Sequence, residues 1–290
     1  MLGFANVFKP AGPTSAAVVA RVRRMYGLYS RDRRIAVGHL GTLDPQAAGV
    51  LPVAIGKATR LIPLLTNQRK SYVCTFVPGR STSTADALGE TVQSMEPSPG
   101  WERKLRDVLP QFIGKLEQVP PMHSAVHFEG KRLYELAREG KHVEVKSRPV
   151  SIYGLSLLGT EGGAARLRVA CSEGTYVRTL CEDIGKAIGI PAHMGALVRE
   201  GSGPFLLAES LTLEDIAADP GGSLIAPEHI IPFPTIVLDL RHSADFRAGR
   251  LVPLPAGATA KHVFVRDESR TLVGVGETHG ALLAPRKVFV

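Results

Sequence analysis

The sequence has few cysteines, no long apolar run and no recognisable metal-binding pattern. Its three cysteines lie far apart without a C-x-x-C pair, and its nine histidines show no H-E-x-x-H or comparable spacing. These absences argue against a disulfide framework and against a zinc site. No stretch of about 18 apolar residues could cross a membrane, and the N-terminus lacks the apolar core of a signal peptide. We therefore expect a cytoplasmic protein that binds no metal ion and no membrane.

Aromatic residues are also sparse, at 6%, and negative charge is outnumbered by positive charge. The 290 residues include 35 Lys or Arg and 27 Asp or Glu, which gives a formal net charge of +8. Such a surface attracts nucleic acids, because Lys and Arg release counterions when they neutralise phosphates. Charge alone leaves an ordinary solvated surface equally open. The length and the 44% hydrophobic content fit a globular protein with one large domain and one small domain.

Arginines are concentrated in one stretch near the N-terminus. Thr14 or Ser15 can cap a helix whose apolar stripe consists of Val18, Val19, Val22 and Met25. This helix and the residues after it carry six arginines, with Tyr26 and Tyr29 among them. The arginines are Arg21, Arg23, Arg24, Arg31, Arg33 and Arg34. This face is either a solvated helix surface or a surface that binds RNA phosphates, with rings nearby for stacking.

Hydrophobic periodicity alternates along the chain between a strand pattern and a helix pattern. Alternation predicts strands over residues 71–77, 151–158 and 165–171. Apolar stripes predict a helix over about residues 105–112, a short helix over 131–138, and a longer helix that begins near residue 174 and buries Val177, Leu180, Cys181, Ile184 and Ile188. Beyond Pro232, short β-branched runs between turn residues predict a small all-β domain. The pattern therefore indicates an α/β (α+β) protein.

The densest unusual segment is a glycine-rich loop before an apolar strand, residues 38–51, GHLGTLDPQAAGVL. Pro45 disfavours the α region for Asp44, while Gly41 and Gly49 permit turns and the close approach of a ligand. Asp44 would then project from a stiff loop. An Asp-Pro pair also commonly closes a turn without taking part in any chemistry, and the loop alone leaves that alternative open.

This loop resembles the catalytic signature of the TruB-type pseudouridine synthases, G-H-x-G-x-L-D-P-x-A-x-G-V-L. The family resemblance extends, in the same order, over nearly the whole chain: residues 9–15, 70–72, 119–125, 130–134, 171–180, 197–205 and 284–289. It implies that Asp44 is the nucleophilic aspartate of the family and that His39 lies near a flipped-out uridine.

The resemblance also implies roles for residues distant from the loop. Arg178, in the first turn of the long predicted helix, would pair with Asp44, because a guanidinium can hold a carboxylate by two hydrogen bonds and favours its charged form. Tyr72 would stack on the target uracil, and Tyr176 and Leu197 would line the same pocket. Taken alone, an arginine at position 178 is more often a surface residue bound to water, and a strand aromatic such as Tyr72 is more often part of the core.

The fold that the resemblance implies is a mixed, largely antiparallel central sheet flanked by helices over residues 1–234, followed by a small PUA-like β-barrel that binds RNA over residues 235–290. The implied activity is isomerisation of a T-loop uridine of tRNA to pseudouridine, without metal or coenzyme. The partner would be the T arm of tRNA, bound by a monomer. The target base would have to be flipped out of its stack, which costs a few kcal/mol.

Five residues depart from the family pattern outside the catalytic set: Phe8, Ala16, Leu40, Val198 and Glu200. These departures concern contacts with RNA rather than the chemistry. Two other functions remain as alternatives. One is an RNA chaperone that uses the same basic surface without catalysis. The other is a glycoside or nucleoside hydrolase, which would need a second carboxylate near Asp44, and none stands out in the sequence. His123 is interpreted as a packed loop residue rather than an acid, base or ligand.

Overall fold

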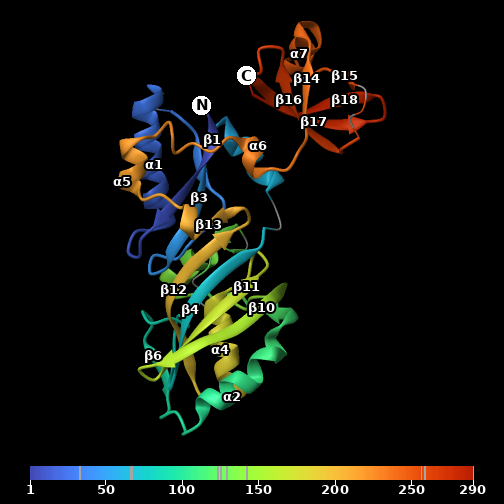
Figure 1. The fold of residues 1–290 in the computed structure, drawn as a ribbon. Coiled ribbons are helices and arrows are strands. Elements are labelled where there is room, and N and C mark those ends of the chain that lie inside the picture. The colour runs from blue at the N-terminus through green and yellow to red at the C-terminus, as the bar shows by residue number, and fades with distance from the viewer. Residues whose placement is uncertain are drawn as a thin grey trace.

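A computed structural model describes residues 1–32, 34–65, 68–122, 124, 126–128, 130–141, 143–255, 257 and 259–289 (Figure 1). Its largest element is a nine-stranded sheet of order β1-β3-β12-β4-β11-β10-β7, in which β2 also pairs with β3 and β13 with β12. The strands are β1 (Leu2–Lys9), β2 (Val37–His39), β3 (Ala48–Gly56), β4 (Lys70–Pro78), β7 (Gly114–Gln118), β10 (Arg148–Glu161), β11 (Ala164–Cys171), β12 (Ala192–Ser202) and β13 (Phe205–Leu206).

The central sheet is mixed, because β12 runs parallel to β3 and antiparallel to β4. The other pairs in this sheet are antiparallel. Helices flank it: α1 (Ser15–Ser30) and α5 (Leu213–Ala218) at the end that carries β1, and α2 (Trp101–Val108) and α4 (Val177–Ile188) at the other end (Figure 1). The predicted mixed, largely antiparallel sheet with flanking helices is thereby confirmed.

Alternation along β4 decides which side chains meet α4. Tyr72, Cys74 and Phe76 are buried in one core cluster, whereas the residues between them are half-buried. The apolar stripe of α4 enters the same cluster through residues that include Val177, Leu180 and Ile184. Because the first turn of α4 contains Arg178, this packing brings the arginine to the side of the sheet that buries Tyr72.

Helix α1 begins where the sequence predicts it, with the Thr14 side chain accepting a hydrogen bond from the backbone N–H of Ala17. Its apolar stripe is buried, and Arg21 and Arg24 are exposed. The expectation that two tyrosine rings are available for stacking is wrong for Tyr26. Its ring is buried and its hydroxyl is hydrogen-bonded to Ser223, because Tyr26 continues the apolar stripe. Tyr29 is exposed, and Arg33 lies outside the described residues.

The C-terminal part forms a separate five-stranded sheet of order β14-β16-β17-β18-β15. Its strands are β14 (Thr235–Leu238), β15 (Val252–Pro253), β16 (His262–Asp267), β17 (Leu272–His279) and β18 (Leu282–Val288). This half-barrel is consistent with a PUA-like fold. The expectation of an all-β domain is wrong, because this part contains helix α7 (Leu240–Arg247). The helix is capped by Asp239 and buries Phe246 in the core of the half-barrel.

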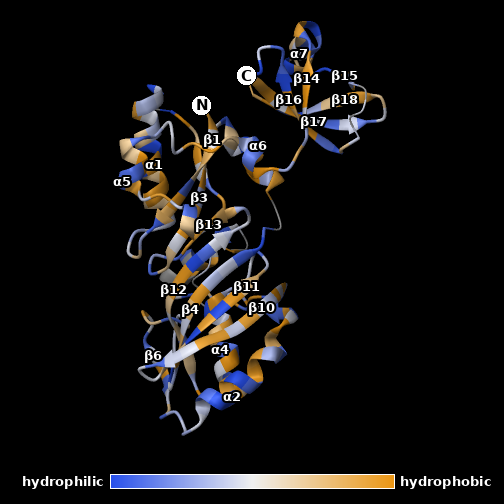
Figure 2. Cartoon of the chain, in the orientation of Figure 1, coloured by the Kyte–Doolittle hydropathy of each residue, from blue (hydrophilic) through white to orange (hydrophobic). Residues whose placement is uncertain are grey.

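A second cluster joins the half-barrel to the rest of the chain. Phe264 and Val275 pack in one hydrophobic cluster with Phe4 and Val50. Figure 2 shows orange, apolar residues alternating with white and blue ones along the strands of the central sheet. Among the described helices, none is long and apolar enough to span a membrane.

The segments between the strands carry shorter elements. These are the 3-10 helices η1 (Lys57–Leu64), η2 (Leu109–Phe112) and η3 (Leu207–Glu209), the strands β5 (Arg80–Thr82), β6 (Thr91–Ser94), β8 (His127–Phe128) and β9 (Lys131–Arg132), and the helices α3 (Leu133–Arg138) and α6 (Pro227–Ile230). The predicted helix over residues 131–138 thus begins two residues later, after a short strand. His123 lies outside the described residues.

Candidate active site

Asp44 lies in the loop between β2 and β3, as the sequence predicts. The loop is fixed on one side by Ser15, whose hydroxyl donates to the carbonyl of Leu43 at 2.8 Å and accepts from the N–H of Leu43 at 2.9 Å. On the other side Gly49 has a φ of 110°, and a Cβ there would collide with the backbone of Arg199. A side chain at this position would therefore push the loop away from β12. The result is a closely packed loop that holds Asp44 in one place.

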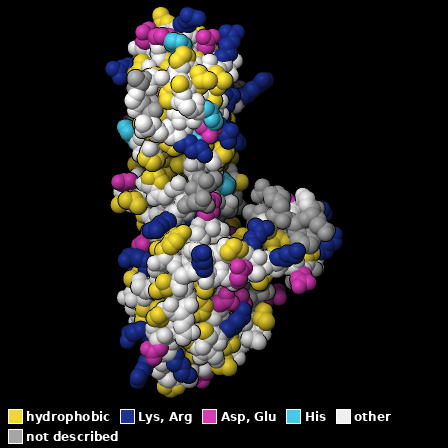
Figure 3. All heavy atoms as spheres, turned by 90° about the vertical axis from the view of Figure 1, so that its right-hand side faces the viewer, with side chains coloured by type: hydrophobic (Ala, Val, Ile, Leu, Met, Phe, Trp, Pro, Cys, Tyr) yellow, Lys and Arg dark blue, Asp and Glu magenta, His cyan; other side chains and the backbone are white. Residues whose placement is uncertain are grey.

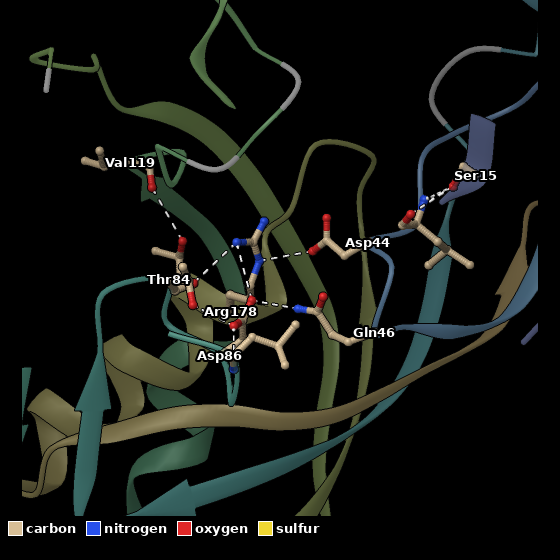
Figure 4. A network of polar contacts seen from close by, with 10 residues as sticks. Ser15, Asp44, Gln46, Thr84, Asp86, Val119 and Arg178 are labelled. Carbon is tan, nitrogen blue, oxygen red and sulfur yellow. Dashed lines mark hydrogen bonds and ion pairs between the residues drawn. The ribbon is translucent and has the colours of Figure 1, made fainter. Parts of the chain in front are cut away.

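Arg178 and Asp44 form the ion pair that the sequence predicts. The guanidinium Nε lies 3.1 Å from Asp44 Oδ2, and the Arg178 side chain is 5% exposed, against 35% for that of Asp44 (Figure 4). The Nη1 of Arg178 also donates to the carbonyl of Thr84 at 3.3 Å. The cation is thus shielded from water, while the carboxylate remains accessible to a substrate.

A second carboxylate, Asp86, faces the same guanidinium, and no sequence motif points to it. Its Oδ2 lies 3.7 Å from Arg178 Nη1, and its side chain is almost completely buried. Asp86 accepts hydrogen bonds from Gln46 Nε2 at 2.6 Å, from Thr84 Oγ1 at 2.6 Å and from the N–H of Leu88 at 3.1 Å. Arg178 therefore lies between two carboxylates, which compensates for its unfavourable place at the N-terminal, positive end of α4.

The carbonyl groups around Asp44 are held by two buried cations, Lys9 and Arg199. Lys9 Nζ donates to the carbonyls of Pro45 at 3.0 Å and Ala47 at 2.6 Å. Arg199 donates to the carbonyls that precede and follow this segment: Gly41 at 3.1 Å, Thr42 at 3.3 Å and Val50 at 2.7 Å. Desolvation by burial lowers the pKa of Lys9 to about 8, although the nearby Asp44 carboxylate acts in the opposite direction.

Tyr72 and Leu197 are brought together with the loop of Asp44. Both are buried in the cluster that contains Leu43 and Ala47, and Tyr72 is paired with Arg199 across β4 and β12. Burial raises the pKa of the Tyr72 hydroxyl, and the guanidinium of Arg199 partly offsets this rise. The phenol therefore stays protonated at neutral pH. Its position on the apolar side of β4 makes Tyr72 both a core aromatic and a neighbour of the loop.

The two remaining candidates lie at the start of the loop and just before α4. His39 ends β2, and its Nδ1 accepts a hydrogen bond from the N–H of Gly41 at 3.3 Å, so it shapes the start of the loop. Tyr176 immediately precedes α4 and is half-buried. Its N–H donates to Gln118 Oε1 at 3.0 Å, and this bond fixes the backbone just before Arg178.

Sequence reasoning missed Asp86, Gln46, Lys9 and Arg199 as parts of the site. Asp86 occupies a turn of small and polar residues between β5 and β6, a place where an acid is ordinarily solvated. Lys9 lies in a motif segment that says nothing about its bonds, and Arg199 lies between two residues, Val198 and Glu200, that depart from the family pattern. Glu200 itself pairs with Arg168 on the exposed side of the sheet. Figure 3 shows Lys and Arg scattered among Asp and Glu over the face seen there, rather than gathered in one patch.

Comparison with known proteins is consistent with this geometry. Residues 23–177 match the family described as TruB family pseudouridylate synthase (N terminal domain), and residues 178–220 match the tRNA pseudouridylate synthase B C-terminal domain. The chain is 46% identical over 223 residues to tRNA pseudouridine synthase B of Pelotomaculum thermopropionicum, covering 75% of this chain and 69% of the relative. It is 39% identical over 291 residues to tRNA pseudouridine synthase B of Pseudomonas fluorescens, covering 97% of this chain and 93% of the relative.

Solved structures agree with the sequence relatives. A structure of an H/ACA RNP bound to a substrate RNA containing 2'-deoxyuridine superposes with a TM-score of 0.66 at 26% identity, covering 99% of this chain and 85% of that one. The family model, the sequence relatives and the solved structure all indicate the same family. This chain therefore belongs to the TruB family of pseudouridine synthases, which are isomerases.

Proposed function

We propose that this protein converts a uridine in the T loop of tRNA to pseudouridine, with Asp44 as the nucleophile and without metal or coenzyme. The observation that carries the proposal is the ion pair between Asp44 and the buried Arg178. It holds an accessible carboxylate in a fixed orientation on a loop whose carbonyls are bound by Lys9 and Arg199. The relatives named tRNA pseudouridine synthase B support tRNA as the substrate.

The chemistry needs a carboxylate and little else from the protein. The bond between C1' and N1 breaks, the uracil turns while it stays bound, and a bond forms between C1' and C5. C5 then loses its proton and N1 gains one, so no electrons are gained or lost overall. A carboxylate can attack the sugar or the base, or remove a sugar proton, and each of these routes requires the ionised form. Arg178 stabilises that form by charge, and its burial strengthens the attraction.

The remaining site residues are proposed to hold the flipped nucleotide. Tyr72 and Leu197, packed beside Leu43 of the loop, keep 9% and 8% of their surface exposed, and we propose that an extruded uracil packs against this small apolar area. His39 and Tyr176 flank this surface at the start of the loop and at the N-terminus of α4. We further propose that residues 1–234 form the catalytic domain of a monomeric, cytoplasmic enzyme and that residues 235–290 bind the RNA.

The test is the formation of pseudouridine in an unmodified tRNA transcript by the purified protein in the presence of EDTA. We expect one pseudouridine in the T loop from the wild type and none from Asp44→Asn, which keeps the size of the side chain and removes its charge. Asp107→Asn, at an exposed acid of α2, is the matched control and should retain full activity.

Two outcomes would contradict the proposal. Formation of pseudouridine at another position, or none at all, would exclude the T-loop assignment. Full activity of Asp44→Asn would exclude Asp44 as the nucleophile. If Asp44→Asn instead forms no pseudouridine but still rescues a tRNA folding defect, that result would favour an RNA chaperone. The hydrolase alternative loses support from the structure, because Asp86, the nearby second carboxylate, is buried behind Arg178.

A further inference from the structure

Gln46 connects the loop of Asp44 to the buried carboxylate on the far side of Arg178. It lies two residues after Asp44, and its amide Nε2 donates to Asp86 Oδ2 at 2.6 Å (Figure 4). Asp86 belongs to the turn between β5 and β6, so this hydrogen bond joins segments that are 40 residues apart in the chain. Side-chain contacts therefore run from Asp44 to Arg178, from Arg178 to Asp86 and from Asp86 to Gln46, which lies on the same loop as Asp44.

We propose that Gln46 is a positioning residue for the isomerisation, acting by satisfying Asp86 so that Arg178 stays on Asp44. This inference rests on the proposed role of Asp44. The Oδ1 of Asp86 accepts from Thr84 and Leu88, and its Oδ2 accepts from Gln46. The same Oδ2 is 3.7 Å from Arg178 Nη1, beyond direct hydrogen-bond length, whereas Arg178 Nε is 3.1 Å from Asp44.

Loss of the Gln46 amide would change which of the two carboxylates, Asp44 or Asp86, the Arg178 guanidinium contacts more closely. A buried carboxylate oxygen that loses a donor is costly, so Asp86 would attract the nearest cation. Arg178 Nη1 is already close enough that a small rotation would give a direct bond to Asp86. That rotation would lengthen the contact between Nε and Asp44, and Asp44 would lose the orientation that the reaction needs.

The first variant is Gln46→Met, which has similar length and no donor. We expect the single-turnover rate with saturating enzyme to fall about tenfold, as for the loss of a hydrogen bond to a charged group. Affinity for tRNA, measured by filter binding, should change by less than about twofold, because the amide points at Asp86 inside the protein. Gln111→Met, at an exposed glutamine of η2, is the matched control and should keep the wild-type rate.

The second variant, Gln46→Glu, separates positioning from simple packing. A protonated carboxyl can donate to Asp86 as the amide does, whereas an ionised one cannot and repels Asp86. The charged groups that face this position are Asp86, Asp44 and Arg178, together with Lys9, whose Nζ binds the carbonyls on either side of Gln46. The two neighbouring carboxylates favour uptake of a proton, so the defect should be largest at high pH.

The measurement is the ratio of the single-turnover rate of Gln46→Glu to that of the wild type between about pH 8.5 and about pH 5.5, a range over which a carboxyl beside a like charge can titrate. We expect this ratio to rise as the pH falls. The ratio for Gln46→Met should stay constant, and Gln111→Glu should follow the wild type at every pH.

A wild-type rate for Gln46→Met would overturn the inference, and so would a ratio for Gln46→Glu that is independent of pH. Neither result would touch the proposed function, which is tested separately in the same assay by wild type and Asp44→Asn. If instead the wild type makes no pseudouridine in the T loop, the proposed function fails first, and the inference falls with it.

Discussion

Replacement of Arg178 by lysine tests how much of the site depends on the shape of the guanidinium rather than on its charge. Arg178 reaches Asp44 through Nε and the carbonyl of Thr84 through Nη1, and the second nitrogen also faces Asp86. A lysine carries one nitrogen and cannot occupy both places. It must therefore give up either the bond to Asp44 or the contacts with Thr84 and Asp86.

The size of the effect follows from the bond that is lost. A hydrogen bond to a charged group contributes about 1.5 to 3 kcal/mol, and every 1.36 kcal/mol of barrier changes a rate about tenfold. Arg178→Lys should therefore lower the single-turnover rate by about 10- to 150-fold. Affinity for tRNA should remain near that of the wild type, because the arginine side chain is buried and turned toward Asp44.

The assay is single-turnover formation of pseudouridine with enzyme in excess over tRNA, together with filter binding of the same transcript. Lys186→Arg, at an exposed residue in the last turn of α4, exchanges the same two side chains in reverse away from the site and should have no effect. A wild-type rate for Arg178→Lys would refute the reasoning, since it would show that a point charge is sufficient. A rate loss matched by an equal loss of affinity would show that Arg178 binds the RNA instead.

Three further predictions concern residues around the site. Tyr72→Phe should retain more single-turnover activity than Tyr72→Ala if the ring supports the uracil by stacking, and equal losses would implicate the hydroxyl instead. Burial lowers the pKa of Lys70 to about 8, so the folded protein releases this proton at lower pH than the unfolded chain does. Folding therefore becomes more favourable as the pH rises above about 8, and the urea midpoint should rise between about pH 8 and pH 10 more in the wild type than in Lys70→Met. Arg21→Gln combined with Arg24→Gln should weaken tRNA binding and reduce its dependence on salt, without changing the single-turnover rate at saturating enzyme. An unchanged salt dependence would show that the exposed face of α1 is solvated and does not bind the RNA.

Elements with a local signal were predictable from the sequence. The stripe from Val177 to Ile188 defined α4 and placed Arg178 in its first turn, and alternation around Tyr72 defined β4. The glycines and Pro45 marked the loop of Asp44. The pairing of Asp44 with Arg178, 134 positions apart by their numbers, came from the family resemblance, because residue spacing carries no information about such a contact.

The rest of the site depends on contacts between distant residues, which produce no hydrophobic periodicity in the sequence. Asp86 resembles a surface acid in the sequence, and only the fold of the β5–β6 turn buries it against Arg178. Arg199 continues the alternation that buries Leu197, so the pattern alone would have placed a charged side chain in the core. Helix α7 was missed because it is a short element within β-branched runs, and its start is signalled mainly by the capping residue Asp239.

Lys9 and Arg199 are buried beside the loop of Asp44 and bind its backbone. Burying a cation is unfavourable, and the lowered pKa of Lys9 reflects that cost. Here both cations bond to carbonyl oxygens on the two sides of Asp44, so their charge is used to hold a loop that has no regular hydrogen-bonding pattern of its own. Together with Arg178 they surround Asp44 with more positive than negative charge. The same arrangement stabilises an anion at this point of the fold and fixes its direction before the RNA arrives.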